Sequence, residues 1–304
     1  MNHILVEVLE KIRPDENESK KIDELSQNLI DKVNAIDGVN IEPLIVGSVA
    51  KGTNLKGADV DLFIKFDTET NLKENGLNIA RKILPEGKEL YAQHPYLRGE
   101  IDEIGVDVVP CYSINDSSKP ISAVDRTPFH TQWVNENISG KEDEIRISKQ
   151  FLKGAGAYGA NAAIGGFSGY LVEILCIKYG GFKELVDQLS LWRPPVVLEK
   201  VEGAPDSVIM LPDPVDPTRN VAAGVTLKGL GAAVLASKAF LQKPTIDFFF
   251  PKIKMRNSKG CITTIILPRP KGSEETVLPW LQKQGRKIYN AISDFEPIGW
   301  NANL

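Results

Sequence analysis

Three aspartates, Asp59, Asp61 and Asp107, are the residues of this 304-residue chain that are best suited to chemistry. Residues 58–66 alternate as a strand does, which places Asp59 and Asp61 on one face and apolar side chains on the other. Carboxylates two residues apart on one strand face lie roughly 6–7 Å from each other, and they repel unless a cation joins them. Hard divalent ions such as Mg²⁺ take oxygen ligands and keep positions open for water and phosphate oxygens. The spacing therefore predicts a divalent metal site.

Two further features support a site for phosphates. The turn at Gly47-Ser48 follows a short apolar strand end and offers backbone N–H groups and a hydroxyl, which suits a triphosphate. Asp107 is the only charge in the apolar segment IGVDVVP, and a buried carboxylate is costly unless it is paired or metal-bound. Asp107 by itself also fits a strand-edge aspartate bonded to a backbone N–H. Together with Asp59 and Asp61 it predicts a two-metal site.

The order of these features resembles a known signature. An apolar residue, Gly-Ser, ten residues and then Asp-apolar-Asp-apolar resembles the signature of the DNA polymerase β-like nucleotidyltransferase superfamily. A closer resemblance, to the archaeal (class I) CCA-adding tRNA nucleotidyltransferases, runs from about residue 40 to 250. It rests on the runs YAQHPYLRG, IGVDVVPCY, SAVDRTPFHTQWV, GKEDEIRISKQFLKGAGAYGA, GFSGYLVEIL and DPVDPTRNVA. The resemblance implies a transferase that adds C, C and A to the tRNA 3′ end from CTP and ATP. It would work without a template, with two Mg²⁺ ions and with release of pyrophosphate.

The resemblance also implies roles for single residues. Asp59, Asp61 and Asp107 match the catalytic, metal-binding carboxylates. The positions that contact the incoming nucleotide are Ser48, Lys51, His130, Lys149, Tyr158 and Arg219, with His94 as a neighbour of the site. Ser48 and Lys51 match phosphate contacts; arginine is also familiar at position 51, and lysine keeps the charge but loses bidentate geometry. Arg219 matches the arginine that reads the C or A base edge, a task suited to its fork of donors.

The residues taken alone leave alternatives open. Lys149 and Lys153 lie four residues apart in a helix predicted over 142–153, which also fits a solvated basic helix face. His130 also fits a core histidine, and Tyr158 an ordinary turn aromatic. Among functions, an oligoadenylate synthetase-like or cyclic-dinucleotide synthase-like enzyme would share the Gly-Ser and carboxylate features while using a nucleotide acceptor. A non-catalytic tRNA-binding module is the third class, and the three intact aspartates argue against it.

Periodicity predicts the elements that position these residues. Helices are expected over 1–12, 20–36, 71–84 and 227–242, and a helix after residue 165 should end at Gly180-Gly181. Two strands are expected within 89–112 around a turn near residues 98–100, and a proline-rich loop over 192–217. The predicted fold class is α+β, with a catalytic nucleotidyltransferase head over 1–140 whose mixed sheet carries the carboxylates, and a helical neck over 141–250. Residues 251–304, with a strand over 261–270 and a helix over 277–292, would begin an α+β body domain. Because family members are usually longer, the resemblance implies an incomplete body and no tail domain.

Composition bounds the class of protein. With 42% hydrophobic and 25% charged residues, the chain reads as an ordinary globular protein. Residues 227–304 hold 12 Lys and Arg against 5 Asp and Glu, a net charge of +7, so the first 226 residues carry −11 of the overall −4. A basic C-terminal third suits a phosphate-bearing partner, although it equally fits a solvated face. The three cysteines are scattered, the start is polar and no apolar run approaches a membrane span. We therefore expect a cytoplasmic enzyme without a membrane partner; the oligomeric state is not indicated.

Overall fold

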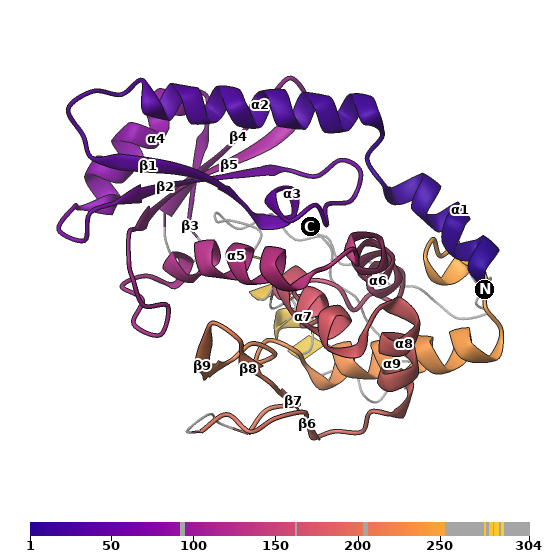
Figure 1. Ribbon diagram of the computed structural model, residues 1–304. Coiled ribbons are helices and arrows are strands. Elements are labelled where there is room, and N and C mark those ends of the chain that lie inside the picture. Colours follow the sequence, from indigo (N-terminus) through magenta and orange to yellow (C-terminus); the bar gives the residue numbers. More distant parts are fainter. Residues whose placement is uncertain are drawn as a thin grey trace.

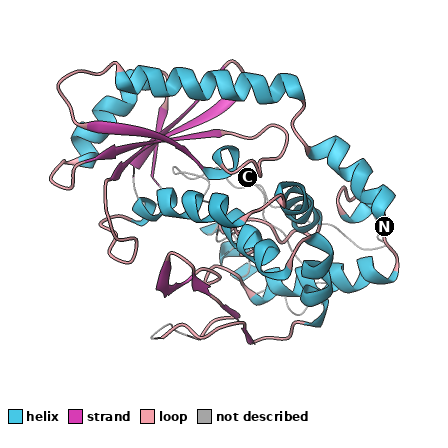
Figure 2. Ribbon diagram, viewed as in Figure 1, coloured by secondary structure: helices cyan, strands magenta, loops and turns pink. Residues whose placement is uncertain are grey.

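A mixed sheet with its helices and a separate cluster of helices make up the molecule (Figures 1 and 2). The computed structural model describes residues 1–91, 95–161, 163–202 and 206–252, together with several positions between 277 and 288. This architecture confirms the predicted α+β class with a mixed sheet. In the described residues no helix is both long enough and apolar enough to cross a membrane.

Within the described residues, the main sheet contains the first five strands of the chain. They are β1 (Ile41–Val46), β2 (Val60–Phe66), β3 (Lys88–Tyr91), β4 (Pro95–Ile101) and β5 (Ile104–Tyr112). Their order across the sheet is β1-β2-β5-β4-β3. The central pair, β2 and β5, is parallel, and the other neighbouring pairs are antiparallel. Equivalent residues of β2 and β5 therefore lie side by side and face the same way.

One face of the sheet is covered by two helices, α2 (Glu16–Asn34) and α4 (Leu77–Ile83). The alternation predicted for β2 is confirmed, because its apolar residues Val60, Leu62, Ile64 and Phe66 are buried in this core. Asp15 caps α2 by accepting the N–H of Glu18 at 2.9 Å. A π-helical turn, η1 (Leu72–Gly76), precedes α4, so the helix expected over 71–84 is present with an altered first turn.

The turn between β4 and β5 differs from the prediction. It was expected near residues 98–100, but the chain turns at Asp102 and Glu103, which have φ angles of 50° and 66°. Gly99 instead lies inside β4, where a side chain would press on Leu84. Aspartate tolerates the left-handed backbone conformation, so a glycine is not needed at this turn. The consequence is that Arg98 becomes a strand residue paired with Asp107 of β5.

Helices dominate the second unit. They are α1 (Asn2–Ile12), α5 (Thr127–Asn137), α6 (Glu142–Gly154), α7 (Gly169–Tyr179), α8 (Phe182–Leu191) and α9 (Leu227–Gln242). Those expected over 142–153 and 227–242 are confirmed, and α7 ends as predicted at Gly180, whose φ is 106°. The proline-rich stretch is not only loop. It contains the short strands β6 (Val196–Val197), β7 (Ile209–Met210), β8 (Pro212–Asp213) and β9 (Asp216–Asn220), the last two of which form a hairpin.

The described residues form separate apolar cores for the two units. The N-terminal helix α1 buries Ile4, Val8 and Ile12 against the helical unit and not against the sheet that follows it in sequence. The domain limits at residues 140 and 250 stay predictions. The body domain expected from residue 251 lies almost entirely outside the described residues, and Cys261 with it. Cys111 and Cys176 are buried free thiols.

An aromatic cluster joins α9 to the rest of the helical unit. It consists of Phe151, Phe182, Phe240, Phe248 and Phe249, with ring centroids 5.4 to 6.4 Å apart for the pairs in contact. Phe240 is fully buried in α9, whereas Leu235 of the same helix is 68% exposed. These two residues provide a matched pair of sites.

We predict that Phe240→Ala lowers the free energy of unfolding by about 3–5 kcal/mol, because it leaves a cavity among aromatic rings. Leu235→Ala should change it by less than about 0.5 kcal/mol, as expected for an exposed position. Urea denaturation followed by circular dichroism measures both. Equal losses in the two variants would contradict the assignment of α9 to this core.

Candidate active site

Two carboxylates lie next to each other at the centre of the sheet. Asp61 of β2 pairs in register with Asp107 of the parallel strand β5. Asp59 comes just before β2, and a side chain at Gly105, at the start of β5, would collide with its Oδ1 atom. The structure therefore brings together the three aspartates that the sequence indicated, although they are 48 residues apart along the chain at most.

Crowding of these carboxylates changes their acidity. Burial, followed by the nearby charges of Asp107 and Asp59, raises the pKa of Asp61 to about 7. Burial also raises the pKa of Asp107 to about 6, with Arg98 opposing the shift and Asp59 adding to it. Carboxyl groups with pKa values this high stay charged at neutral pH only at a cost in free energy. A cation placed among them would remove that cost.

Arg98 supplies part of the positive charge that offsets the crowded carboxylates. The sequence did not indicate this residue as part of the site. Its guanidinium group forms an ion pair with Asp59 and donates from Nη1 to Oδ2 of Asp107 at 3.4 Å. The residue was assigned to a turn, so its side chain had no predicted direction. Arg98 pairs in register with Asp107 of the antiparallel strand β5, and this register directs its side chain to the carboxylates.

The Gly47-Ser48 turn lies against the same carboxylates. Gly47 begins the short helix α3 (Gly47–Ala50) with a φ of 73°, and a side chain there would collide with Oδ2 of Asp61. Only glycine combines this backbone conformation with so close an approach. Ser48 follows directly and is partly exposed, as the predicted contact with a phosphate requires.

The donor set fits a divalent cation in part. Asp107 has a buried carboxylate oxygen, Oδ1, without a hydrogen-bond partner among the described residues. Carboxylate oxygens are the preferred ligands of hard cations. As they are oriented in the described chain, no three Asp, Glu, His or Cys side chains are grouped closely enough to share one ion. Asp61 and Asp107 are neighbours in register, whereas Asp59 is held in an ion pair with Arg98.

Lys51 and Lys149 meet on one buried carboxylate. Glu173 of α7 is 1% exposed and accepts from Lys51 at 2.6 Å and from Lys149 at 2.8 Å. Burial alone would raise the pKa of Glu173, but the two ammonium groups hold it below its usual value. Lys149 does not lie on a solvated helix face, since it is 2% exposed. A lone acid within the apolar run GYLVEILCIKY was the sequence signal for Glu173, and it went unused.

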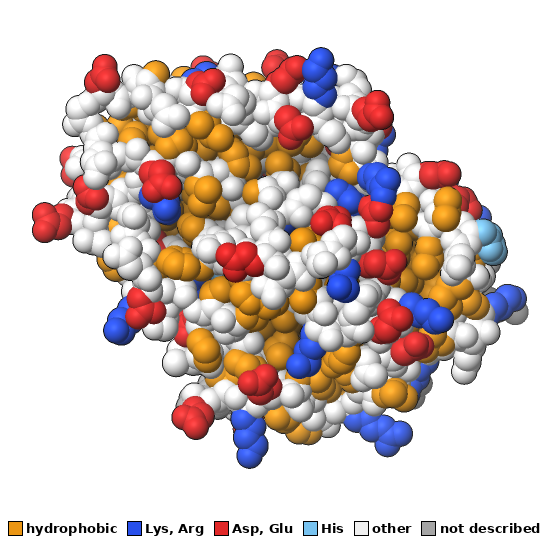
Figure 3. Space-filling view, in the orientation of Figure 1, with side chains coloured by type: hydrophobic (Ala, Val, Ile, Leu, Met, Phe, Trp, Pro, Cys, Tyr) orange, Lys and Arg blue, Asp and Glu red, His pale blue; other side chains and the backbone are white. Residues whose placement is uncertain are grey.

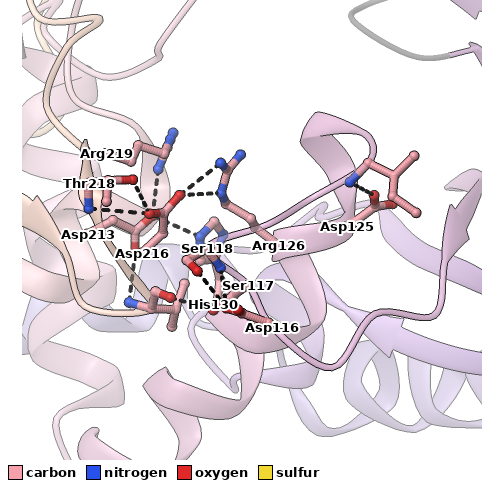
Figure 4. A network of polar contacts seen from close by, with 12 residues as sticks. Asp116, Ser117, Ser118, Asp125, Arg126, His130, Asp213, Asp216, Thr218 and Arg219 are labelled. Atoms are coloured by element: carbon pink, nitrogen blue, oxygen red, sulfur yellow. Dashed lines mark hydrogen bonds and ion pairs between the residues drawn. The ribbon is translucent and has the colours of Figure 1, made fainter.

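His130 and Arg219 converge on a second buried carboxylate, Asp213 (Figure 4). The distances to its Oδ2 atom are 3.0 Å from His130 Nε2 and 2.6 Å from Arg219 Nη1. Tyr170 donates to Oδ1 at 3.0 Å, and its ring stacks on that of His130 with centroids 4.0 Å apart. Next to this group, Arg126 is held by Asp216 at 2.8 Å. Arg219 is 41% exposed, so its remaining donors are accessible.

Tyr158 lies between the second unit's helices. Burial raises its pKa to about 12, and the Lys153 ammonium lies 5.6 Å from the centre of its ring. Any side chain at Gly169 would approach its hydroxyl, so the phenol points to the start of α7. His94 lies outside the described residues, and nothing tests its predicted place beside the site.

Lys51 connects these groups into one site. Its charge acts on Asp61, its ammonium is bonded to Glu173, and it lies 5.8 Å from the ring centre of Tyr170. Lys51 thus interacts electrostatically with Asp61 and contacts Glu173 and Tyr170, and Tyr170 in turn bonds to Asp213. Carboxylates, ammonium groups and an accessible arginine in this order suit a nucleotide, with its phosphates beside the carboxylates and its base near the arginine.

The surface shown in Figure 3 carries no extended patch of one sign. Acidic and basic side chains are interspersed on this face, with apolar side chains between them. This face therefore does not provide the broad basic surface that a nucleic acid would favour.

Comparisons with known proteins identify both units. Residues 26–130 match the nucleotidyltransferase domain, and residues 143–250 match the second domain of tRNA nucleotidyltransferase. Relatives called CCA-adding enzyme include those of Thermoplasma volcanium (40% identical, 96% of this chain covered), Thermoplasma acidophilum (41%, 90%) and Thermococcus kodakarensis (38%, 99%). The matches span 70%, 66% and 74% of these relatives' own lengths.

Solved structures share the fold at lower identity. Cid1 poly(U) polymerase with bound Mg 3′-dATP has a TM-score of 0.62 and 14% identity, covering 79% of this chain and 92% of Cid1. CdnC of E. coli MS115-1 with ATP has a TM-score of 0.58 and 16% identity, covering 81% of this chain and 94% of CdnC. At these identities the likeness concerns the fold alone.

The Gly47 turn yields a test with an internal control. Gly57 has nearly the same φ, 71°, but a side chain there would meet nothing within 4 Å. We predict that Gly57→Ala costs roughly 1–2 kcal/mol of stability for the left-handed backbone alone. Gly47→Ala should cost clearly more and should also weaken Mn²⁺ binding, because its methyl group displaces Asp61. Urea denaturation and a Mn²⁺ titration measure the two effects; identical behaviour of the variants would refute the close approach.

Proposed function

Because the chain belongs to the CCA-adding enzymes, we propose that it adds C, C and A in turn to the tRNA 3′ end, from CTP and ATP and without a template. It is accordingly a nucleotidyltransferase. The observation that carries the proposal is the side-by-side placement of Asp61 and Asp107 in a chain 38–41% identical to such enzymes over nearly its whole length. None of the relatives and solved structures named above is described as an oligoadenylate synthetase or a cyclic-dinucleotide synthase.

The proposed reaction is an in-line phosphoryl transfer. The 3′-oxygen of the RNA forms a bond to the α-phosphorus of the nucleotide, and the bond from that phosphorus to the pyrophosphate oxygen breaks. Asp59, Asp61 and Asp107 would hold the divalent ions, and Mg²⁺ suits their oxygen donors. Bound Mg²⁺ neutralises charge that develops on the phosphoryl oxygens and on the leaving pyrophosphate. Arg98 keeps Asp59 and Asp107 close to each other.

The nucleotide site extends from these carboxylates into the helical unit. Its proposed members are Ser48, Lys51, His130, Lys149, Tyr158 and Arg219. The phosphates would lie near Ser48 and Lys51, and the base near Arg219, whose guanidinium is oriented by Asp213. The acceptor is the tRNA 3′ end. The basic segment 227–304 is proposed to bind its backbone, but that segment is described only in part. The cytoplasmic location stays a prediction.

The direct test is nucleotide addition to defined RNA ends. The protein is incubated with Mg²⁺, labelled CTP or ATP, and tRNA transcripts that lack the last three, two or one nucleotides of CCA. We expect CMP addition to the first two substrates, AMP addition to the third and none to a completed CCA end. Extension of free nucleotides but not of tRNA would favour the synthase-like alternative.

The carboxylates should trade stability for activity. We predict that Asp61→Asn and Asp107→Asn each lose roughly a hundred- to a thousandfold in kcat, the order that removal of one group stabilising transition-state charge produces. Because the pKa of Asp61 is raised in the folded state from 3.8 to about 7, the folded protein loses stability as the pH rises between these two values. In EDTA at pH 8, Asp61→Asn should therefore be more stable than the unsubstituted protein, by on the order of 1–4 kcal/mol.

Urea denaturation at pH 8 and pH 5 measures this difference, which should shrink at pH 5, where Asp61 is protonated in the folded protein. Asp23→Asn, at an exposed position of α2, is the control and should alter neither activity nor stability appreciably. Near-normal turnover of Asp107→Asn would refute the assignment of the metal-binding carboxylates.

Arg219 should govern base selection more than rate. We predict that Arg219→Ala loses roughly 1–3 kcal/mol of discrimination between CTP or ATP and the other nucleotides, because a forked donor to the base edge is removed. Arg219→Lys keeps the charge but not the fork, and it should lose discrimination nearly as far. The measurement compares kcat/KM for CTP, ATP, UTP and GTP. Strict rejection of UTP and GTP by both variants would contradict the specificity role.

A further inference from the structure

Glu173 lies at the junction of the two units and joins residues that are far apart in sequence. It is the only acidic residue of α7, and its neighbours on that helix are buried apolar side chains. Its Oε2 atom accepts from Lys51, which follows α3 in the sheet unit. Its Oε1 atom accepts from Lys149 of α6 and from the hydroxyl of Thr53 at 2.7 Å. One carboxylate thus holds two ammonium groups, and the group carries a net charge of +1.

The two lysines differ in the donors that they have left. Lys149 donates to the carbonyl and hydroxyl oxygens of Thr53, at 3.2 and 2.9 Å, and to Glu173. An ammonium group has three hydrogens, so Lys149 is fully used. In the part of the chain that the structure describes, Lys51 donates to Glu173 alone. Two hydrogens of the Lys51 ammonium therefore have no acceptor among the described residues, and they are available to a ligand.

Lys51 also has the better location of the two for a triphosphate. Its charge acts on Asp61, and its ammonium lies 5.8 Å from the ring centre of Tyr170, whose hydroxyl bonds to the carboxylate that orients Arg219. It stands between the catalytic carboxylates and the proposed base-reading arginine. That is where the phosphates of the proposed nucleotide would lie.

We infer that Glu173 is a positioning residue that aims the Lys51 ammonium at the nucleotide triphosphate. The inference rests on the proposed function. Its physical basis is that a lysine side chain has a long, flexible stem, and the buried carboxylate removes that freedom before the ligand arrives. The surplus positive charge of the group gives the triphosphate a favourable field in a site with little water.

A double-mutant cycle separates positioning from a purely structural role. Equilibrium binding of labelled CTP and ATP is measured, with Mg²⁺ and without tRNA, for Glu173→Gln, Lys51→Met and the double variant. Lys51→Met should weaken nucleotide binding by about tenfold, the order expected for one charge-assisted contact. Glu173→Gln should weaken it several-fold by itself but by less than about twofold in the Lys51→Met background, because its effect passes through Lys51.

Two further variants keep the test decisive. Glu173→Asp retains the charge and draws both ammonium groups back by one methylene. It should fold normally and bind nucleotide more weakly. This variant decides the question if Glu173→Gln does not fold. Leu185→Ala, which removes a buried apolar side chain of α8 in the same core, should lose stability with unchanged nucleotide binding.

The outcomes distinguish the inference from the function beneath it. The positioning role would be overturned if Glu173→Gln weakened nucleotide binding equally with Lys51 present and in the Lys51→Met background. It would also be overturned if Glu173→Asp bound nucleotide as tightly as the unsubstituted protein. Failure of the unsubstituted protein to extend tRNA lacking CCA would instead overturn the proposed function.

Discussion

Parallel pairing of β2 with β5 sets Asp61 opposite Asp107, and Asp59 adds a third carboxylate one residue before β2. This crowding of like charge is unfavourable by itself, and the surrounding residues compensate for it. Arg98 of β4 forms ion pairs with Asp59 and Asp107, and the charge of Lys51 opposes the rise in the pKa of Asp61. Glycines at positions 47 and 105 allow the close approach, because a side chain at either would strike one of the carboxylates. Under the proposed function, the arrangement would hold negative charge in place for a divalent cation at a cost in stability.

Buried polar groups, more than apolar contacts, join the part of the site on the sheet to the part on the helices. Glu173 bonds to a lysine from each unit, and Asp213 bonds to His130, Tyr170 and Arg219. Buried ion pairs add little net stability, because desolvation offsets their attraction, but removing one partner is severe. Their contribution is directional. Stability comes from elsewhere, notably from the aromatic cluster around Phe151 and Phe240.

The fold and the chemistry are separable in this molecule. Cid1 and CdnC share the architecture at 14% and 16% identity, so the architecture alone does not select a substrate. Selection would have to arise from side chains that the helical unit adds to the carboxylate edge, among them Arg219 on the β8–β9 hairpin. The hairpin is short and irregular, yet the buried Asp213 fixes its position. A small element can thus carry specificity when its anchor is buried.

The sequence by itself determined the helices over 142–153 and 227–242, the end of α7 at Gly180, the two faces of β2 and the candidate carboxylates. These follow from local rules: the period of apolar residues, glycine's left-handed conformation and the cost of a lone buried charge. It did not determine the partners of the charges. Arg98 was read as a turn residue, and Lys149 alone fitted a solvated face, because a side chain's direction depends on strand register and on packing between units. Lys51 and Glu173 are 122 residues apart, and only the tertiary structure makes them neighbours, since no local pattern encodes which buried carboxylate a distant ammonium will meet.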